Sequence, residues 1–510
     1  MLTYSIFALM ITLIFGYLMR KKESSGFHFA DIPVSIILAM SISAGFDTSP
    51  FYKGELELDS AIFVYIAERM HDGKVPYLDL FDHKGPALYF LEYAGTFLGK
   101  TGIWLILTLS LALSALLIIF TVRLVFSRLI TQYSAAFFTL MTSELFVSLF
   151  CGGNYTETLA LPAICYAFFV FSQFLIRGQY KSRDIILLGA SFMYVLMLRA
   201  NMISVWIVYV PVVIIHFIIK KQFSRTLSCA GLFAAGALLT AIPYIIYACV
   251  TSSFTDYMRY YWRFNFVYTG STYDSITAEG NLLYFLIVII PVALILIISL
   301  FKGLKNRAYV INLIFIALSL ITAFISARPY SHYVIPVLPA MILPAAFMAE
   351  TIFSARIPVL HEFDPKTVLV PGIICSVGLC FFAVTHAMTM TGSEHIMTPD
   401  EKELAEYIEN ESTSGDDILF VGFPCTYYLS FDRSTGNKFF YQYPVTLSEE
   451  LNDEFFGEIS ETRSSLVIIN NGEFYGNTPL HKLNAALEKQ LPSLGYTLED
   501  HGSFLVYRYG

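Results

Sequence analysis

Residues 46–99 read FDTSPFYKGELELDSAIFVYIAERMHDGKVPYLDLFDHKGPALYFLEYAGTFLG, a polar stretch between long apolar segments. Ionisable side chains gather here, whereas most of the other segments before Thr391 are apolar. Charged residues make up only 14% of the 510 residues, and hydrophobic residues make up 56%. A soluble protein has about a quarter charged residues. The composition therefore predicts a membrane protein, in which the loop 47–102 carries the chemistry.

Twelve segments resemble membrane spans, which need roughly 17–25 apolar residues to cross about 30 Å of hydrocarbon. The segment 2–19 is not a typical signal peptide, because its basic residues follow the apolar run. Three of these segments are short (31–46, 184–198 and 202–219). For them the sequence allows either a tilted span or a hairpin that enters and leaves the membrane on one side. The predicted fold class is a polytopic α-helical membrane protein with about twelve transmembrane helices, at 2–19, 31–46, 103–126, 132–150, 157–176, 184–198, 202–219, 227–250, 282–301, 308–326, 333–353 and 367–389.

Lys and Arg recur in every second loop between these segments, starting with Arg20–Lys22. Basic loops stay on the cytoplasmic side of a membrane. The remaining loops are then predicted to face outward, and they are 47–102, the CGGNYTE turn (151–157), 251–281, the ARPYSH turn (327–332) and everything after Thr391.

The chain changes character near residue 390, and we predict two domains, 1–390 in the membrane and 391–510 outside it. From Asp400 onward there are 7 basic and 19 acidic residues, a net charge of −12. This acidity argues against nucleic acid or an anionic lipid surface as a partner of the tail. Its pattern predicts an extracytoplasmic α/β domain, which serves as a scaffold or as a lid that positions an acceptor, with helices at 399–410, 448–459 and 479–491 and strands at 417–422, 464–470 and 504–510.

Several common chemistries lack their signatures. The seven cysteines mostly lie within predicted spans, so a disulfide framework is not expected. The sequence has no CxxC zinc spacing, P-loop or nucleophile elbow. No cofactor is predicted to be required, and a divalent metal at Asp82, His83 and His332 is the weaker alternative.

Ionisable residues retained at a membrane usually face a cavity or a substrate path. The outward loops place such residues on one side of the membrane, together with many tyrosines that suit either the interface belt or stacking on sugars. The ionisable set is Asp59, Asp79, Asp82, His83, Lys84, Glu157, Arg259, Arg263, Arg328 and His332, with Arg199 near the outer end of its span.

Residues 58–90 resemble the first external loop of the GT-C superfamily of polyprenyl-phosphate-sugar-dependent glycosyltransferases, in particular its bacterial family 39-like and aminoarabinose transferase-like branch. Further similarities are an acidic residue opening an interfacial helix, a Lys-Gly-Pro before the next span, an acidic external turn (GGNYTETLALP, 152–162) and a late HYVIPVLP (332–339). The resemblance covers essentially the whole chain. One departure is His83, which stands where the aminoarabinose branch has an acidic residue and puts any metal ligand there in doubt.

The resemblance implies transfer of a sugar from a polyprenyl-phosphate donor, itself a membrane lipid, to a glycan, lipid or protein acceptor on the outer face of the cell membrane. It implies Asp59 as general base, Lys84 as the cation that holds the donor phosphate and Glu157 as the second acidic residue. The predicted helpers of Lys84 are Arg199, Arg259, Arg263 and Arg328. The predicted substrate-binding residues are Asp82, His83, Tyr89, Asn154, Tyr155, His332 and Tyr333.

One carboxylate and one cation are sufficient for this transfer in chemical terms. A departing phosphate needs little protonation, unlike the alkoxide leaving group in glycoside hydrolysis. Each residue also has a structural alternative. Asp59 is a possible N-cap, Lys84 can extend its ammonium to the interface, and Glu157 can favour a helix dipole. His332 is a possible interface histidine, and Asp79 and Asp82 are possible turn acceptors.

Two other functions are also compatible with a protein that has many membrane spans. A secondary transporter needs related halves with charges near mid-membrane, whereas most charges here lie on one side. A lipid-linked polysaccharide polymerase or ligase uses the same logic with a longer donor.

Overall fold

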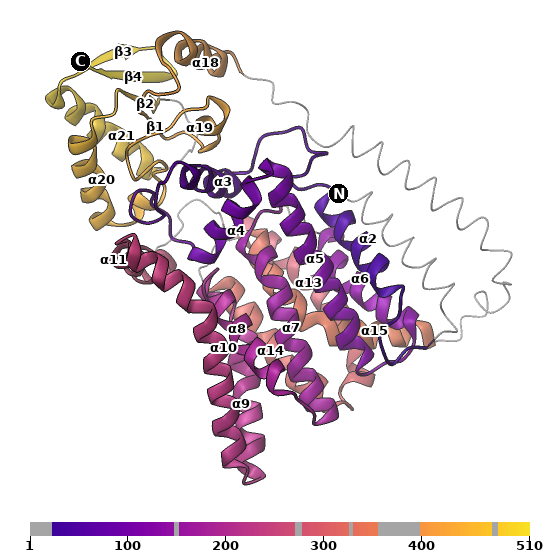
Figure 1. The fold of residues 1–510 in the computed structure, drawn as a ribbon. Helices are drawn as coiled ribbons and strands as arrows, with labels where there is room; N and C mark the ends of the chain where they lie inside the picture. The colour runs from indigo at the N-terminus through magenta and orange to yellow at the C-terminus, as the bar shows by residue number, and fades with distance from the viewer. Residues whose placement is uncertain (1–22, 147–151, 271–277, 326–329, 355–397, 472–477) are drawn as a thin grey trace, which may run out of the picture. The chain divides into compact units, whose positions relative to one another are not determined.

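The computed structural model describes residues 23–146, 152–270, 278–325, 330–354, 398–471 and 478–510 (Figure 1). The chain divides into two compact units. The first contains Met1–Tyr52, Leu98–Tyr244 and Ile276–Thr391, and the second contains Lys53–Phe97, Ile245–Ser275 and Gly392–Gly510. Most of the polar loop, residues 47–102, therefore belongs to the same unit as the C-terminal residues. A domain boundary at residue 390 stays a prediction.

Helices make up the first unit, as its apolar segments predict. Helix α5 packs against both α2 and α7, and α15 packs against α6 and α13 (Figure 1). The elements are α2 (Asp31–Ser43), α5 (Gly99–Arg123), α6 (Leu129–Phe146), α7 (Thr156–Arg177), α8 (Ser182–Leu196), the 3-10 helix η1 (Ala200–Met202), α9 (Ser204–Ile219), α10 (Phe223–Val250, which ends in the second unit), α13 (Ala278–Gly303), α14 (Arg307–Phe324), the 3-10 helix η3 (Ser331–Met341) and α15 (Ile342–Ser354).

Five stretches of the described residues are long and apolar enough to cross a membrane, and they are Gly99–Arg123, Thr156–Arg177, Phe223–Val250, Arg307–Phe324 and His332–Ser354. Several other predicted spans also contain helices, including the short α2, α8 and α9. The predicted spans 2–19 and 367–389 lie outside the described residues. The chain is therefore a polytopic helical membrane protein, while the number of about twelve helices stays a prediction.

A buried ion pair joins α2 to α5 in the first unit. Both Arg123 Nη atoms donate to the Asp31 carboxylate at 2.7 and 2.8 Å, and the Gln132 side chain accepts from Arg123 Nε at 2.9 Å. The Tyr133 hydroxyl also donates to Asp31. A bidentate guanidinium–carboxylate pair tolerates burial because hydrogen bonds satisfy both charges.

The second unit combines short helices with one β-sheet. Its helices are α3 (Leu58–His71), α4 (Pro86–Thr96), α11 (Phe254–Tyr257), the π-helix η2 (Met258–Arg263), α12 (Phe264–Gly270), α18 (Pro399–Glu411), α19 (Thr426–Ser430), the 3-10 helix η4 (Pro444–Leu447), α20 (Glu449–Thr462), α21 (Thr478–Gln490) and the 3-10 helix η5 (Leu491–Leu494). Its strands are β1 (Ile418–Val421), β2 (Leu466–Asn470), β3 (Tyr496–Asp500) and β4 (Phe504–Tyr509).

The sheet has the strand order β1-β2-β4-β3. Strands β1 and β2 are parallel and pair Ile418 with Leu466, whereas β4 runs antiparallel to both of its neighbours. Every residue of β1 is buried, which explains its uninterrupted apolar sequence. Helix α18 begins with a capping box, in which Thr398 Oγ1 accepts from the backbone of Glu401 and the Glu401 carboxylate accepts from the backbone of Thr398.

The polar loop packs on the C-terminal residues within this unit. The Tyr65 ring of α3 lies 4.9 Å from the Tyr428 ring and 4.8 Å from the Phe440 ring, centroid to centroid. The backbone of Phe81 donates to the carbonyl of Lys438 at 3.0 Å. These contacts fix the loop between α3 and α4, and that loop carries most of the predicted site.

Candidate functional site

The loop 72–85 between α3 and α4 is held by its own hydrogen bonds. Asp79 accepts from the backbone of Val75 at 2.7 Å, so this carboxylate acts as a turn acceptor, the structural alternative for that residue. Tyr77 has φ +70°, which is strained for a bulky residue, and its hydroxyl donates to the carbonyl of Lys84 at 2.7 Å. Strained backbone of this kind often lies at functional sites.

Asp82 is the centre of a hydrogen-bonded group that we call the Asp82 cluster, consisting of Asp82, His83, Lys84, Tyr89 and Tyr441. The Tyr89 hydroxyl donates to Asp82 Oδ2 at 2.7 Å, and the Tyr441 hydroxyl donates to Oδ1 at 2.6 Å. The backbone of His83 also donates to Oδ1, at 2.7 Å. Asp82 is only 1% exposed, so these donors take the place of water around its carboxylate.

Asp82 is ionised despite its burial. Burial by itself would raise the pKa of the carboxyl, but the Lys84 charge and the bonds from His83 and Tyr441 outweigh it and hold the pKa well below its ordinary value. Burial beside this carboxylate raises the pKa of Tyr441 well above the ordinary tyrosine value. The cluster therefore combines a carboxylate with a hydroxyl that keeps its proton.

Lys84 and Asp59 lie on the same side of α3. The Lys84 ammonium is 5.7 Å from the centroid of the Phe63 ring, and Asp59 precedes Phe63 by one helical turn. Asp59 also interacts electrostatically with Tyr441. Its N-cap alternative is wrong, because the cap residue is Glu57 and Asp59 is already inside the first turn.

His83 points into an aromatic environment from α12. Its ring lies 4.6 Å from the Tyr268 ring and 5.7 Å from the Phe264 ring. The Asn265 side chain donates to the carbonyl of His83 at 2.8 Å. Helix α12 thus supports the backbone on which Lys84 is mounted.

A second group of predicted residues gathers in the first unit, where the CGGNYTE turn leads into α7. Gly152 and Gly153 have φ of +77° and +80°, a conformation that favours glycine. A Cβ at Gly153 would lie 2.1 Å from the Phe46 ring, so no larger residue fits there. The backbone of Asp47 donates to the carbonyl of Gly152 at 3.1 Å.

The residues that follow this turn form what we call the Glu157 cluster, consisting of Tyr155, Glu157, Arg199, His332 and Tyr333. The Arg199 guanidinium forms an ion pair with Glu157 and lies 4.1 Å from the centroid of the Tyr333 ring. The Tyr155 and His332 rings are stacked at 4.1 Å. Electrostatic interaction links His332 to Glu157, and Asn154 is fully buried in the adjoining turn.

The predicted donor arginines of the second unit contact acidic residues of α20. Arg259 Nη2 lies 2.8 Å from the Glu454 carboxylate, and Arg259 Nε lies 3.0 Å from the Glu450 carboxylate. Arg263 is 3.4 Å from Glu450 and is mostly exposed. A role for these two arginines with the donor stays a prediction, and Arg328 lies outside the described residues.

Metal binding was the weaker alternative for Asp82, His83 and His332. Within the described residues, no group of three or more His, Cys, Asp or Glu side chains has the arrangement to hold a metal ion. His83 Nδ1 lies 3.2 Å from the Asp82 carboxylate.

Sequence reasoning missed Tyr441 as a member of the site. It lies 359 residues from Asp82 in the sequence, in the aromatic run FFYQY at 439–443. Three tyrosine or phenylalanine residues in a row are unusual for the polar tail and are the signal that points to this segment.

The fold is similar to that of solved membrane proteins. ArnT from Cupriavidus metallidurans, in a structure bound to undecaprenyl phosphate, matches with a TM-score of 0.57 at 12% identity over 94% of this chain and 97% of that one. The apo structure of the same protein matches with a TM-score of 0.56 at 13% identity over 92% and 96% of the two chains. Archaeal AglB from Archaeoglobus fulgidus scores only 0.43, a likeness too distant to carry weight. The predicted GT-C-like fold is thereby confirmed.

The apolar helices define a polytopic membrane protein, and its fold is similar to that of ArnT. Residues 21–356 match the family described as "Putative competence-induced protein Ccs4 N-terminal domain". The match spans well over half of the sequence, and the chain belongs to this family. No curated protein matches it significantly.

Proposed function

We propose that this chain is an inverting glycosyltransferase that moves a sugar from a polyprenyl-phosphate donor to an acceptor at the outer face of the membrane. The observation that carries the proposal is the Lys84 ammonium, which lies 5.7 Å from the centroid of the Phe63 ring, and Phe63 follows Asp59 by one turn of α3. The likeness in fold to ArnT, which has been solved with undecaprenyl phosphate, supports it.

In this mechanism Asp59 takes the proton from an acceptor hydroxyl, whose oxygen attacks the anomeric carbon from the face opposite the phosphate. The bond between the anomeric carbon and the phosphate oxygen breaks, and its electron pair stays with the polyprenyl phosphate. The new glycosidic bond has the inverted configuration. Asp59 lies in the first turn of α3.

Lys84 stabilises the negative charge that grows on the departing phosphate. It can do so because, in the described part of the chain, no carboxylate lies within ion-pair distance of its ammonium. Asp82 positions Lys84 through the backbone that joins them, and Tyr89 and Tyr441 fix Asp82. Tyrosine hydroxyls and the backbone of His83 donate the hydrogen bonds of the Asp82 carboxylate, while the Lys84 charge also stabilises it and remains available to the substrate.

For the Glu157 cluster of the first unit we keep the predicted roles, with Arg199 as a ligand of the donor phosphate and Glu157 as the second acidic residue. Asn154, Tyr155, His332 and Tyr333 supply aromatic faces and polar groups suited to a sugar. A glycan, a glycolipid and a protein hydroxyl are all acceptors that this chemistry accommodates. The alternative of a polymerase or ligase uses the same residues with a lipid-pyrophosphate donor.

The test uses the purified full chain with a panel of polyprenyl-phospho-monosaccharides, and it measures release of polyprenyl phosphate. The wild type should release it with at least one donor. Asp59→Asn should lower the rate by about 10²–10⁴-fold, because the general base is lost, while donor binding stays near the wild-type value. The matched control is Glu55→Gln, an exposed acid shortly before α3, which should behave as the wild type.

Three results would contradict the proposal. Normal turnover by Asp59→Asn would remove Asp59 as the base. Reaction with only a lipid-pyrophosphate glycan would favour the ligase. Solute uptake into proteoliposomes, without sugar release from any donor, would favour the transporter.

A further inference from the structure

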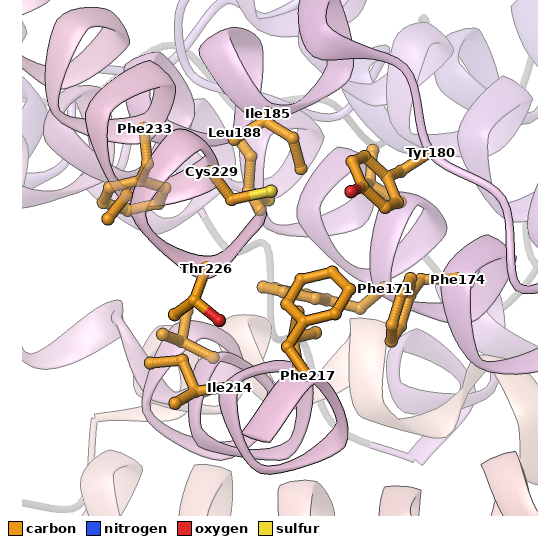
Figure 2. Close-up of a pocket in the computed structure, with 14 residues that line it drawn as sticks. Phe171, Phe174, Tyr180, Ile185, Leu188, Ile214, Phe217, Thr226, Cys229 and Phe233 are labelled. Carbon is orange, nitrogen blue, oxygen red and sulfur yellow. The ribbon is translucent and has the colours of Figure 1, made fainter. Parts of the chain in front are cut away.

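A cavity of about 210 Å³ lies within the first unit, between the C-terminal halves of α7 and α9 and the N-terminal halves of α8 and α10 (Figure 2). Its walls are almost entirely hydrocarbon, supplied by residues such as Phe171, Phe174, Leu188, Phe217 and Phe233. Figure 2 shows these side chains arranged around the central gap. An engineered apolar cavity of roughly 150 Å³ already holds benzene, so this one has room for several methylene groups of a lipid chain.

Close helix packing fixes one side of the cavity. A Cβ at Gly189 of α8 would lie 1.9 Å from the carbonyl oxygen of Phe233, and a Cβ at Gly236 of α10 would lie 1.8 Å from that of Ile186. The two glycines therefore let α8 and α10 cross at backbone contact. The cavity lies beside this crossing, where the larger side chains of α7 and α9 begin.

The cavity is separate from the proposed transferase site. Glu157 is at the start of α7, and Phe174 lies 17 residues later, about 25 Å along the helix axis. The positive-inside pattern predicts that this end of α7 faces the cytoplasm. Its occupant therefore comes from the opposite leaflet to the proposed donor.

Exposed basic residues lie close to the lining residues in sequence at this end of the helices. Each is within four residues of a lining residue, and they are Arg177, Lys181, Arg183, Lys220, Lys221 and Arg225. Tyr180, a lining residue, interacts electrostatically with Arg225. The acidic Asp184 lies 3.5 Å from Arg183. Positive charge beside a hydrocarbon cavity is complementary to an anionic head group joined to an acyl chain.

We propose that this cavity binds one acyl chain of an anionic glycerophospholipid, whose phosphate lies among the basic residues that flank α7, α9 and α10. The lipid fills space that the helices leave open. It also neutralises part of the basic cluster, which ties the four helices together at this end.

The first experiment uses phosphatidylglycerol that carries a photoactivatable group on one acyl chain, with the wild-type chain in nanodiscs. Cross-linked peptides should come from α7, α9 and α10 and include lining residues such as Phe174 and Cys229. Labelling confined to the outer, lipid-facing side of α10, at residues such as Leu227 and Leu239, would overturn the proposal. This arm needs no variant and so does not depend on folding of a mutant.

The second experiment counts lipids retained after detergent extraction, using native mass spectrometry with phosphatidylglycerol and phosphatidylcholine. Ala230→Phe, which fills the cavity, should reduce retained phosphatidylglycerol about tenfold or more. Leu227→Phe is the matched control, since Leu227 is on the same helix but 77% exposed and outside the cavity. Equal loss in both variants, or in neither, would contradict the proposal.

The third experiment separates charge from chain. Combined Lys220→Gln, Lys221→Gln and Arg225→Gln should lower the preference for phosphatidylglycerol over phosphatidylcholine by about tenfold or more. The same change at Lys302 and Lys305, in another basic loop, should leave the preference intact. Displacement of phosphatidylglycerol by polyprenyl phosphate at equal concentration would assign the cavity to the donor's carrier instead. Loss of lipid binding with normal sugar transfer would leave the proposed function standing.

Discussion

The Asp82 and Glu157 clusters each bury a carboxylate, but they satisfy it in different ways. Glu157 forms an ion pair with Arg199, so one buried charge balances another. Asp82 instead accepts hydrogen bonds from two tyrosine hydroxyls and from the backbone of His83, and the charge of Lys84 stabilises it without a direct ion pair among the described residues. In the first arrangement the carboxylate and the cation form a direct ion pair, whereas in the second the carboxylate is held by hydrogen bonds and Lys84 acts on it through its charge.

The largest expected effect is a loss of stability when the ion pair between Glu157 and Arg199 is broken. Glu157→Gln leaves the Arg199 guanidinium, whose side chain is 14% exposed, without its counter-charge. Breaking a buried pair in this way costs about 3–5 kcal/mol of unfolding free energy. Denaturation in detergent micelles measures the loss, with Asp72→Asn as control, because Asp72 is 56% exposed and a surface ion pair such as Arg69–Asp72 is worth about 0–1 kcal/mol. A Glu157→Gln protein that is as stable as the wild type but inactive would make Glu157 a catalytic residue and not a structural one.

The next effect tests whether Lys84 is the cation that acts on the donor. Lys84→Ala should lower sugar transfer roughly 100-fold or more, since it removes a charge aimed at the leaving phosphate. Lys84→Arg should restore part of the activity, although a planar fork does not replace a point charge fully. Steady-state kinetics with varied donor measures both variants. Lys74→Ala, an exposed lysine of the same loop, is the control, and an equal loss there would mean that only the local net charge matters.

A smaller effect on stability and donor binding is expected from a change at Tyr441, the C-terminal tyrosine that donates a hydrogen bond to Asp82. Tyr441→Phe removes one hydrogen bond to an ionised carboxylate, worth about 1.5–3 kcal/mol. The thermal midpoint should fall, and Lys84 should hold the donor less well, so that the donor KM rises more than kcat changes. Tyr93→Phe is the control, because Tyr93 is a half-buried tyrosine of α4 whose ring stacks on His71. An unchanged donor KM in Tyr441→Phe would show that the hydroxyl serves only packing.

The sequence predicted local features well. The long apolar runs predicted α5 and α7, because hydropathy over one continuous segment decides whether a helix can span a membrane. Asp82, His83 and Lys84 are consecutive in the sequence, so their proximity follows without knowledge of the fold. Asp79 and Asp59 show the limit of sequence-based prediction. Only the structure shows that Asp79 is a turn acceptor and that Asp59 lies inside a helix.

The sequence could not predict contacts between distant segments. Tyr441 meets Asp82 across 359 residues, and Arg259 meets Glu450 across 191. Neither partner is set by periodicity or propensity, since each depends on how the polar loop packs against the C-terminal residues. The sequence therefore predicts the arginines of η2 as phosphate ligands, whereas the structure pairs Arg259 and Arg263 with acidic residues of α20.

The smallest expected effect is on the pH dependence of stability. The folded pKa of Asp82 lies below its ordinary value of 3.8, because Lys84 and the hydrogen bonds outweigh burial. A depressed pKa contributes stability that is present above about pH 4 and is lost as the pH falls toward the folded pKa. Thermal midpoints measured between pH 3 and pH 6 should therefore fall less steeply on acidification in Asp82→Asn than in the wild type. Asp72→Asn should keep the wild-type slope. An unchanged slope in Asp82→Asn would mean that Asp82 is not ionised in the folded protein, and the contrast with Glu157 would lose its electrostatic basis.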